Sequence, residues 1–399
     1  MATDTPGSQS ALREANLRRV LRAVRAAGSL TQVEIARSTG LSAATVSTIV
    51  RELQSSAQVV VTPTTTGRRA QSVSLSRLGG LAVGIELGQK HLRGAICDMG
   101  YRVLIEEKIN YDIAQSPERG LRRAAWLVNT LLDQARVDLS QVRGVGVSVL
   151  GPLDPVAEGV RSAPLVPRWQ GVDIAEELSG RVNLPVQLIT DINVITDINA
   201  AALGELACGA SRATADMAYI RLSTSVEAAL VIRGEIYPGS SGLAGQFGHI
   251  TVDESGQVCR CGNRGCLETL VGGPHLLDLL SSQPGRERPT LRGLVQAALD
   301  QDRGSRLVIG DAGRAVGAAA AILCNLLNPR QIVLGGELAQ AGELLLDPIR
   351  QVLDRRTSAA TERVEVRCGE LGDRAVVVGA LATVVRGTAV IDGVDPLLA

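Results

Sequence analysis

Aromatic residues make up only 2% of this 399-residue chain, although apolar residues as a whole make up 45%. The core must therefore be built from Ala, Val, Leu and Ile, which is typical of an α/β protein whose helices carry small side chains. Net charge is also lacking, since 41 basic residues balance 41 acidic ones. That balance excludes a protein that binds polyanions over its whole surface. The length is sufficient for two or three domains with substantial cores.

A signal peptide and an evenly spaced set of cysteines are missing as well. Residues 1–9 are polar, and we expect no apolar run long enough to span a bilayer. The seven cysteines do not form a regular disulfide framework, because three of them fall within eight residues. This pattern predicts a cytoplasmic protein with no membrane partner.

Positive charge is concentrated near the N-terminus. Residues 11–77 carry ten Arg against three Glu, an excess of seven positive charges, so the rest of the chain is acidic by the same amount. A basic head on an acidic body is typical of a nucleic-acid-binding module joined to a separate domain.

The basic head has the pattern of a helix-turn-helix. Residues 12–27 have the apolar spacing of one helix. Thr31 and Glu34 form a capping box that opens a second, short helix. Gly40 then allows a sharp turn into a third helix over residues 43–53.

The third helix is the candidate for base recognition. Its apolar residues face inward, and its other positions are small or polar enough to lie in a major groove. The predicted DNA-binding positions on or before this helix are Ser42, Ala43, Ala44, Thr45, Ser47, Thr48 and Arg51.

A basic wing is expected after the third helix. Two β-rich pieces, residues 59–61 and 73–75, flank a tip with Arg68 and Arg69, which are placed to contact phosphates or a minor groove. The alternative is a small helical domain for protein interaction with a solvated basic face. Because capped helices, a glycine turn and a basic hairpin occur together, the pattern favours a winged helix-turn-helix that binds a double-stranded DNA operator.

One histidine and three cysteines fall in a short segment, residues 249–268. His249, Cys259, Cys261 and Cys266 could surround one tetrahedral Zn²⁺ ion. Four protein ligands leave no open position, so the metal would be structural and would not activate water. The alternative is a set of unrelated buried thiols, which the clustering of such rare residues disfavours.

The body has the pattern of an α/β protein. It follows a hinge at residues 77–80, and strands and helices alternate from there to the C-terminus. The first expected elements are three strands, a helix and a further strand, at residues 81–87, 92–97, 103–108, 117–135 and 144–149.

With these features together, the chain resembles the ROK family, named for repressors, open reading frames and sugar kinases. The motifs that carry the resemblance are Ala244-Gly-Gln-Phe-Gly-His249, the cysteine cluster ending in Glu268, Ser162-Ala-Pro-Leu-Val-Pro-Arg-Trp169, Asp197-Ile-Asn-Ala-Ala-Ala-Leu-Gly-Glu205 and Asn328-Pro-Arg-Gln-Ile-Val-Leu-Gly-Gly336. The resemblance implies a two-lobed, actin-like ATPase fold over residues 81–399, after a winged helix-turn-helix at residues 11–76. Kinase members of the family bind ATP and a hexose. Members with such a head are sugar-responsive transcription factors.

Two phosphate loops of the kinases are altered in this chain. Kinases carry Asp-x-Gly-Gly-Thr-Lys after the first strand, whereas this chain has Glu86-Leu-Gly-Gln-Lys90. The second loop, Gly-Thr-Gly-x-Gly in kinases, is Ser223-Thr-Ser-Val-Glu227. Side chains obstruct a backbone anion site, and the carboxylate of Glu227 would repel a phosphate. We therefore expect no ATP binding and no enzyme activity.

The sugar side of the site is partly retained. By resemblance, His249 orients the pocket and Glu268 contacts sugar hydroxyls, although Glu268 could instead only begin a helix. The family's Asn and Glu are replaced by Leu165 and Gln246, and we expect Gln246 still to form a hydrogen bond in the cleft. Either the ligand differs from the usual hexose, or it binds weakly.

The kinase general base falls in a six-residue tandem repeat that covers residues 189–200. Asp197 has the right spacing to the helix that follows, and Asp191 has the right spacing to the segment before. We favour Asp197, because a helix fixes its geometry, and keep Asp191 as the alternative; Asp197 could also merely cap the helix. Without phosphate loops, either would bind a sugar hydroxyl, beside Asn199, and would not catalyse a reaction.

These features predict a ligand-responsive transcriptional regulator, a repressor of carbohydrate-related genes. It would bind an inverted-repeat operator as a homo-dimer or tetramer, with half-sites about 34 Å apart or a multiple of that. Its effector would be a sugar or a sugar phosphate. The alternatives are a sugar kinase with an accessory DNA-binding head, and a regulator whose body serves only for oligomerisation.

Overall fold

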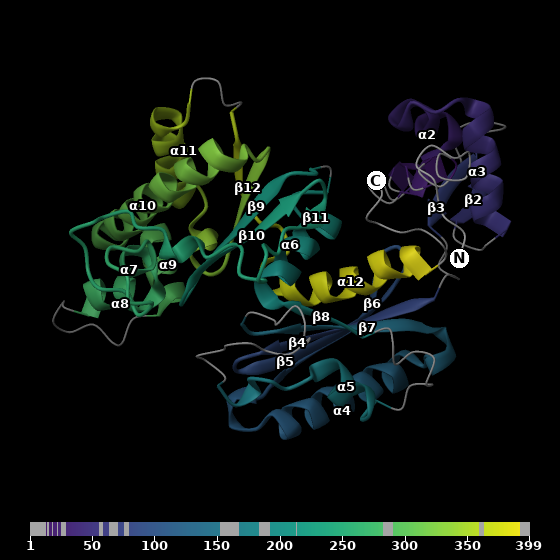
Figure 1. The fold of residues 1–399 in the computed structure, drawn as a ribbon, viewed down its shortest axis with the longest axis horizontal. Helices are drawn as coiled ribbons and strands as arrows, with labels where there is room; N and C mark the ends of the chain where they lie inside the picture. Colours follow the sequence, from purple (N-terminus) through teal and green to yellow (C-terminus); the bar gives the residue numbers. More distant parts are fainter. Residues whose placement is uncertain are drawn as a thin grey trace. The chain divides into compact units, whose positions relative to one another are not determined.

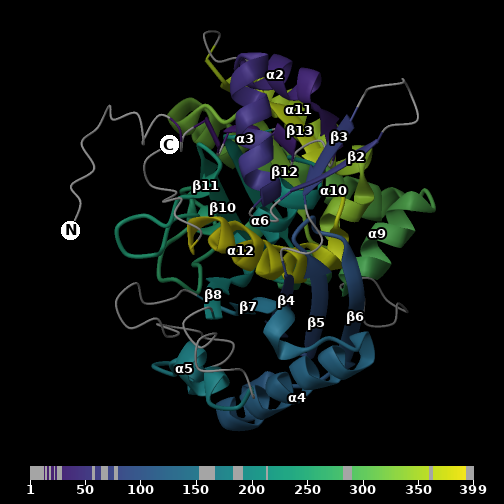
Figure 2. The same cartoon turned by 90° about the vertical axis from the view of Figure 1, so that its right-hand side faces the viewer.

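In this computed structural model, the described residues run from 13 to 391, except for 14–15, 18, 22, 25–28, 56–58, 64–70, 76–79, 152–166, 183–191, 213, 282–289 and 359–362. The chain divides into two compact units (Figures 1 and 2). The first comprises Met1–Leu150, Pro164–Ile195 and Ala380–Ala399, and the second comprises Gly151–Ala163 and Thr196–Gly379. Each unit contains a five-stranded sheet, and the first also contains a three-stranded one.

The N-terminal head is a winged helix-turn-helix. Its described residues between 13 and 24 are helical, and a three-stranded antiparallel sheet has the order β1-β3-β2. Val20, Ile35, Val46 and Leu53 are fully buried in its core. The other elements of the head are α2 (Gln32–Thr39), α3 (Ala43–Ser55), β1 (Ser29–Thr31), β2 (Val59–Pro63) and β3 (Gln71–Leu75).

Local hydrogen bonds explain where the helices of the head begin and end. The Thr31 side chain accepts from the Glu34 N–H, and the Glu34 carboxylate accepts from the Thr31 N–H at 2.7 Å, which confirms the predicted capping box. Gly40 has a φ of 69°, the left-handed conformation that the predicted turn requires. β1 was not expected, because its three residues overlap the capping signal at Thr31.

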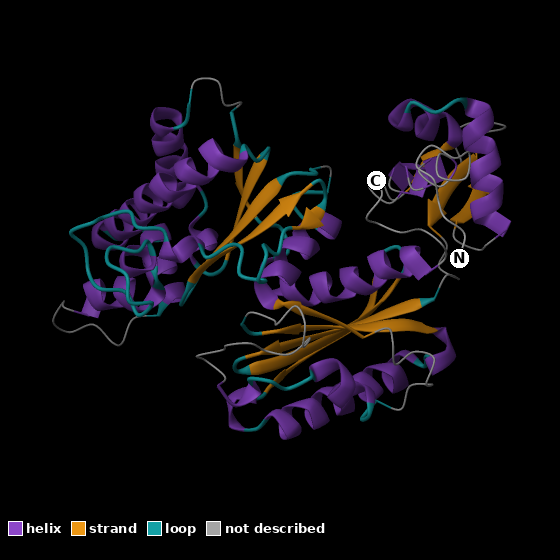
Figure 3. Ribbon diagram, in the orientation of Figure 1, coloured by secondary structure: helices purple, strands orange, loops and turns teal. Residues whose placement is uncertain are grey.

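The first unit's larger sheet has the order β6-β5-β4-β7-β8. β4, β5 and β6 form an antiparallel meander, and β7 pairs with β4 in parallel. The helices α4 and α5 cover one face, and the part of α12 after residue 379 covers the other (Figure 3). These elements are β4 (Leu81–Gly88), β5 (His91–Asp98), β6 (Val103–Asn110), α4 (Pro117–Ala135), β7 (Val142–Val149), α5 (Ile174–Ser179), β8 (Ile192–Thr196) and α12 (Ala375–Ile391).

Close backbone contacts replace aromatic packing around this sheet. A Cβ at Gly146 in β7 would come within 1.9 Å of the Ala380 carbonyl oxygen, so α12 can approach only because that position is glycine. Trp169 is one of the few large aromatic side chains, and it is 1% exposed. Its Nε1 donates to the Ile113 carbonyl at 2.8 Å.

The second unit's sheet has the order β11-β10-β9-β12-β13, with β12 parallel to both β9 and β13. Helix α6 packs against one face, and buried residues of α7 to α11 form one core with the other face (Figure 1). The elements are α6 (Asp197–Cys208), β9 (Met217–Leu222), β10 (Val226–Ile232), β11 (Glu235–Ile236), α7 (Glu268–Val271), α8 (Gly273–Ser281), α9 (Leu291–Leu299), α10 (Arg303–Leu327), β12 (Gln331–Gly335), α11 (Glu343–Arg356) and β13 (Glu365–Cys368).

Alternation along β9 decides which of its side chains meet α6. The even-numbered residues from 218 to 222 belong to the larger core with α10, whereas Met217 and Tyr219 pack in the same cluster as Ala201 of α6. Successive side chains of a strand point to opposite faces. Arg221 therefore lies on the α6 face.

Helix α10 is long and apolar enough to cross a membrane by length and composition alone, so the expectation that no apolar run reaches that length was wrong. In the structure, 56% of its most apolar 18-residue window is buried inside the protein. Val316, Ala319 and Ala320 are fully buried. A Cβ at Gly317 would come within 2.9 Å of Val352, so α11 packs closely here. α10 is a core helix of the second unit.

Candidate functional site

Four potential metal ligands converge in the second unit. The ligand atoms of His249, Cys259, Cys261 and Cys266 all lie within 4.8 Å of one another. His249 Nδ1 lies 3.6 Å from Cys259 Sγ, and Cys261 Sγ lies 3.7 Å from Cys266 Sγ. A tetrahedral ion with Zn–S bonds of about 2.3 Å and Zn–N bonds of about 2.0 Å needs ligand separations of about 3.5 to 3.8 Å. The group can therefore hold one metal ion.

Short turns bring these ligands together. The 3₁₀ helix η6 (Phe247–His249) supplies the imidazole, and an antiparallel bridge pairs Thr251 with Cys266. Gly265 has a φ of 67°, and a Cβ there would come within 1.5 Å of the Asp253 carbonyl oxygen. Only glycine fits at that point, so the chain can fold back between two ligands.

The cysteines of the cluster differ in their surroundings. Cys266 is fully buried, and burial raises the pKa of its thiol to about 12. Cys261 is exposed, and hydrogen bonds, first that of the Asn263 backbone, lower the pKa of its thiol. Cys266 would therefore keep its proton at neutral pH unless a cation, such as a bound metal ion, stabilised the thiolate.

Asp197 is the first residue of α6, directly after β8. Thr196 is the N-cap, and its side chain accepts from the Asn199 N–H, so the alternative that Asp197 only caps the helix is wrong. Asp197 Oδ1 accepts from the Ile198 N–H at 2.9 Å. Asp191 lies outside the described residues.

Arg221 of β9 binds two carboxylates. Its Nη1 donates to Asp197 Oδ2 at 2.5 Å, and its Nη2 donates to Glu227 Oε2. Arg221 and Glu227 are direct cross-strand partners on β9 and β10. Burial alone would lower the pKa of Arg221, but the two carboxylates outweigh burial and raise it above its ordinary value. One guanidinium and two carboxylates leave the trio a net charge of −1.

The turn between β9 and β10 uses backbone donors within the protein. The Ser223 N–H donates to the Ser225 carbonyl at 3.1 Å, and the Val226 N–H donates to Glu268 Oε2 at 3.2 Å. A phosphate loop presents such N–H groups to its anion. These two donors are already engaged.

Glu268 connects this turn to the cluster of His249 and the three cysteines. It is the first residue of α7, as the helix-start interpretation expected, and 11% of its side chain is exposed. Its Oε1 lies 2.8 Å from Arg260 Nε, and Arg260 stands between two of the cysteines in the chain. Asn199 is half-buried on α6, and Gln246 is exposed at the N-cap of η6. These residues, with Asp197 and His249, all belong to the second unit.

The hairpin between β4 and β5 stands where the first phosphate loop was expected. Its Lys90 pairs with Asp112 at 2.5 Å, and Glu86 pairs with His91 at 2.9 Å. A Cβ at Gly88 would come within 2.5 Å of the His91 ring. The basic and acidic side chains of this hairpin are thus paired with protein groups.

The positions on or before α3 that were expected to read DNA lie on its outer surface. Ser42, Ala43, Ala44, Thr48 and Arg51 are exposed, and Thr45 and Ser47 are half-exposed. Arg68, Arg69 and Leu165 lie outside the described residues, as do residues 77–79 of the expected hinge.

Comparison with known families identifies both parts of the chain. The ROK family profile matches residues 82–386. The chain belongs to the ROK family. A winged helix-turn-helix DNA-binding profile matches residues 13–56.

Similar ROK proteins include named regulators. The chain is 27% identical to the xylose repressor of Caldicellulosiruptor bescii over 95% of this chain and 97% of that protein. It is 29% identical to the DNA-binding transcriptional dual regulator NagC of Escherichia coli, over 96% of each.

Solved ROK structures share the fold. A ROK transcriptional regulator described as a homologue of the E. coli MLC protein has a TM-score of 0.77 at 24% identity, over 96% of this chain and 98% of that one. A ROK glucokinase from Streptomyces griseus, solved with glucose and AMPPNP, has a TM-score of 0.61 at 28% identity. The match covers 76% of this chain and 98% of the glucokinase chain. The glucokinase is therefore shorter than the present chain and matches only part of it.

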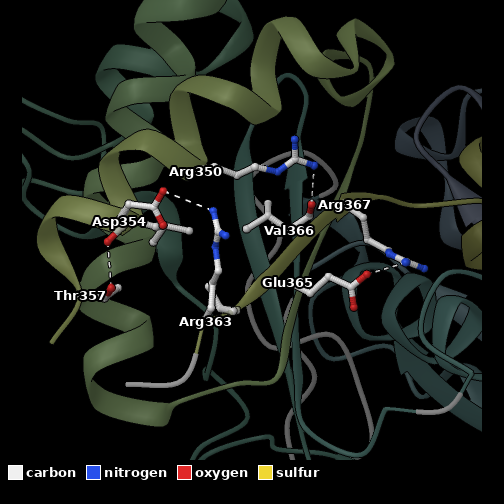
Figure 4. Close-up of a pocket in the computed structure, with 9 residues that line it drawn as sticks. Arg350, Asp354, Thr357, Arg363, Glu365, Val366 and Arg367 are labelled. Carbon is white, nitrogen blue, oxygen red and sulfur yellow. Dashed lines mark hydrogen bonds and ion pairs between the residues drawn. The ribbon is translucent and has the colours of Figure 1, made fainter. Parts of the chain in front are cut away.

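A separate hollow of about 440 Å³ lies between α11 and β13, one of the two edge strands of the second unit's sheet (Figure 4). Its arginines pair with carboxylates: Arg363 lies 3.5 Å from Asp354, and Arg367 lies 2.5 Å from Glu365. The hollow contains none of the residues that the resemblance assigns to sugar.

Sequence reasoning missed Arg221 and Arg260, which pair with the carboxylates of Asp197, Glu227 and Glu268. A signal for Arg221 was present, because it is the one charged residue in the apolar strand Met217–Leu222 and Glu227 follows across a short turn. From the sequence, Glu227 was expected to place a negative charge where a triphosphate would lie; in the structure Arg221 pairs with this carboxylate. The turn between β9 and β10, which corresponds to the second phosphate loop of the kinases, therefore carries an ion pair and not a lone carboxylate.

Proposed function

We propose that this ROK protein is a transcriptional repressor of carbohydrate-related genes whose binding to its DNA operator depends on a sugar or sugar derivative. One observation carries the proposal: a winged helix-turn-helix precedes a ROK body whose β9–β10 phosphate turn is filled by its own side chains. The similarity to the xylose repressor and to NagC over nearly the whole chain supports the same function.

Loss of kinase activity is part of the proposal. The S. griseus glucokinase shares the body fold, so the fold alone does not exclude phosphoryl transfer. However, the Ser223 and Val226 N–H groups donate within the protein, and Arg221 is bound by Asp197 and Glu227. A triphosphate would have to displace these bonds, which disfavours ATP binding.

The metal of the His–Cys cluster is proposed to be a structural zinc ion. Three thiolates and one imidazole are the ligands that zinc prefers, and four protein ligands leave no site for a reactive water. Because the cluster is two residues from Glu268, the ion would hold in place the loop that carries Glu268 and His249.

The head is proposed to read an inverted-repeat operator as part of a homo-dimer or tetramer in the cytoplasm. α3 would lie in the major groove with its exposed residues toward base edges, and Arg68 and Arg69 of the wing would contact phosphates or the minor groove. Two-fold related heads would contact half-sites about 34 Å apart, or a multiple of that.

Operator footprinting with a sugar panel tests the proposal. We expect protection of an inverted repeat that is lost on adding one member of a panel including xylose, N-acetylglucosamine and their phosphates. Arg51→Ala should weaken protection, whereas Arg314→Ala, an exposed Arg on α10, should not. Protection that no sugar alters would favour the alternative in which the body serves only for oligomerisation.

An ATP-dependent hexose phosphorylation assay tests the rival kinase function. The proposal predicts no turnover above background with any sugar that releases the operator. Robust turnover would overturn the non-catalytic assignment.

A further inference from the structure

We propose that the Arg221–Glu227 pair determines which ligands the proposed sugar site beside Asp197 accepts, according to their charge. The site would accept neutral sugars and reject sugar phosphates and other anions. This inference rests on the proposed function, because it narrows the class of effector.

The position of Arg221 is the first support. An arginine on the α6 face of β9, beside Asp197, would by itself attract an anion, since guanidinium groups bind phosphate through two parallel hydrogen bonds. In this chain its two outer nitrogens are already taken, one by Asp197 and one by Glu227. Only 19% of the Arg221 side chain is exposed, so an anion has little access to the three N–H groups that remain.

The surrounding charge is the second support. Arg260 pairs with Glu268, whose Oε2 also accepts from the turn that follows β9. The Arg260–Glu268 pair is neutral, and the Asp197–Arg221–Glu227 trio has a net charge of −1, so the two sets together carry three carboxylates and two guanidiniums. A phosphate ester would enter this region against like charge, and the half-buried setting reduces screening by salt.

A neutral sugar meets a different situation. Its hydroxyl groups are donors, and a carboxylate oxygen that accepts one bond from the protein can accept another. Asp197 Oδ1 accepts one backbone N–H and keeps such capacity, whereas Glu268 Oε2 already accepts from the Val226 N–H and from Arg260 Nη2. The same charges that exclude a phosphate therefore suit a polyol.

Anion binding by full-length protein tests the inference, with inorganic pyrophosphate as the probe. Glu227→Gln keeps the side-chain shape, removes one negative charge and leaves Arg221 with one carboxylate. We expect calorimetric affinity for pyrophosphate to rise at least tenfold over the wild type. Glu365→Gln is the matched control, because it frees Arg367 at β13 in the same way and should give no such rise.

The double variant Glu227→Gln with Arg221→Met identifies the group responsible. Its affinity for pyrophosphate should return to the wild-type level, since the cation is gone. A gain that persists in the double variant, or an equal gain in Glu365→Gln, would overturn the inference.

The wild-type protein provides an independent test that requires no variant. Any sugar that releases the operator should bind at least tenfold more tightly than its phosphate ester. Tighter binding of the ester overturns the inference but leaves the proposed repressor function standing. Failure of every sugar to alter operator binding would instead refute the sugar response, while the pyrophosphate measurements would still test the role of Glu227.

Discussion

Glu205 shows how one buried side chain can hold two elements together. It is 1% exposed, near the end of α6. Its carboxylate accepts from the N–H groups of Ala210 at 2.8 Å, Glu370 at 3.1 Å and Leu371 at 2.9 Å. Bonds to a charged acceptor are stronger than neutral ones, and these three compensate the cost of burying the charge. Glu205 thereby attaches the end of α6 to the segment after β13.

Replacing Glu205 by Gln should lower stability. One oxygen becomes an NH₂ group, which faces backbone donors and cannot accept from them. We expect the free energy of unfolding of the second unit to fall by about 1–3 kcal/mol. The midpoint of chemical denaturation, followed by circular dichroism, measures this. Glu254→Gln removes a carboxylate from an exposed position and is the control; an equal shift in both variants would refute the anchoring role.

A second prediction for a single residue concerns the proposed zinc ligands. Cys261→Ser should reduce zinc, measured by plasma mass spectrometry, from about one ion per chain to near zero and should lower the melting temperature. Cys324→Ser is the control, because Cys324 is buried in α10 outside the cluster and its loss should leave the zinc content unchanged. Zinc that survives Cys261→Ser would show that the ligand assignment is wrong.

At the scale of elements, small residues allow two helices to meet. A Cβ at Gly204 of α6 would come within 2.2 Å of the Ala375 carbonyl, and one at Gly379 of α12 within 1.6 Å of the Ala200 carbonyl. The backbones of α6 and α12 are therefore in direct contact. This contact is the structural counterpart of the scarcity of aromatic residues, since bulky side chains would hold the helices apart.

Gly204→Ala should destabilise the protein in spite of the higher helix propensity of alanine. The added methyl group would collide with backbone that can move only with the whole helix, at a cost of about 1–3 kcal/mol. Gly310→Ala in α10 is the matched control, because its Cβ would meet nothing closer than the Arg314 Nη1 at 3.6 Å. That change should leave stability equal or raise it by up to about 1 kcal/mol. Melting temperatures of both variants decide the question, and equal behaviour would contradict the close contact.

Elements with strong local signals could be predicted from the sequence, and others could not. The helix expected at residues 117–135 is α4 (Pro117–Ala135), because Ser116 caps it and proline occupies its first position. The expected strands are found, with ends that differ by up to two residues. β1 was missed because three residues carry little pattern. The apolar length of α10 was missed because Asp311 and Arg314 interrupt the apolar residues along the sequence.

In the candidate site, too, some features could be predicted from the sequence and others could not. The gathering of His249 with the three cysteines and the outward positions of α3 follow from spacing along the chain, so both could be predicted from the sequence. The Asp197–Arg221–Glu227 contacts depend on the register of β9 with β10 and on the packing of α6 over them. Tertiary geometry of this kind brings together residues 24 positions apart, and no local pattern specifies it.

For the molecule as a whole, the proposed function requires communication between the sugar site and the DNA-binding head. The residues proposed to bind the sugar lie in the second unit, whereas the head lies in the first. α12 spans both units, since its residues to Gly379 belong to the second and those from Ala380 to the first. Whichever residues transmit it, the effect of the sugar on operator binding is a coupling free energy between two sites. The operator must therefore affect sugar binding by the same factor.

That constraint gives a prediction for the full-length protein. If a sugar weakens operator binding tenfold, a coupling of about 1.4 kcal/mol, then saturation with operator must weaken sugar binding tenfold. Calorimetric titration of the sugar into free protein and into the operator complex measures both affinities. In Arg51→Ala, whose operator complex should not form at the same concentrations, added operator should leave sugar affinity unchanged. Equal sugar affinities with and without operator in the wild type, beside release seen in footprints, would mean that the sugar acts elsewhere than on this chain.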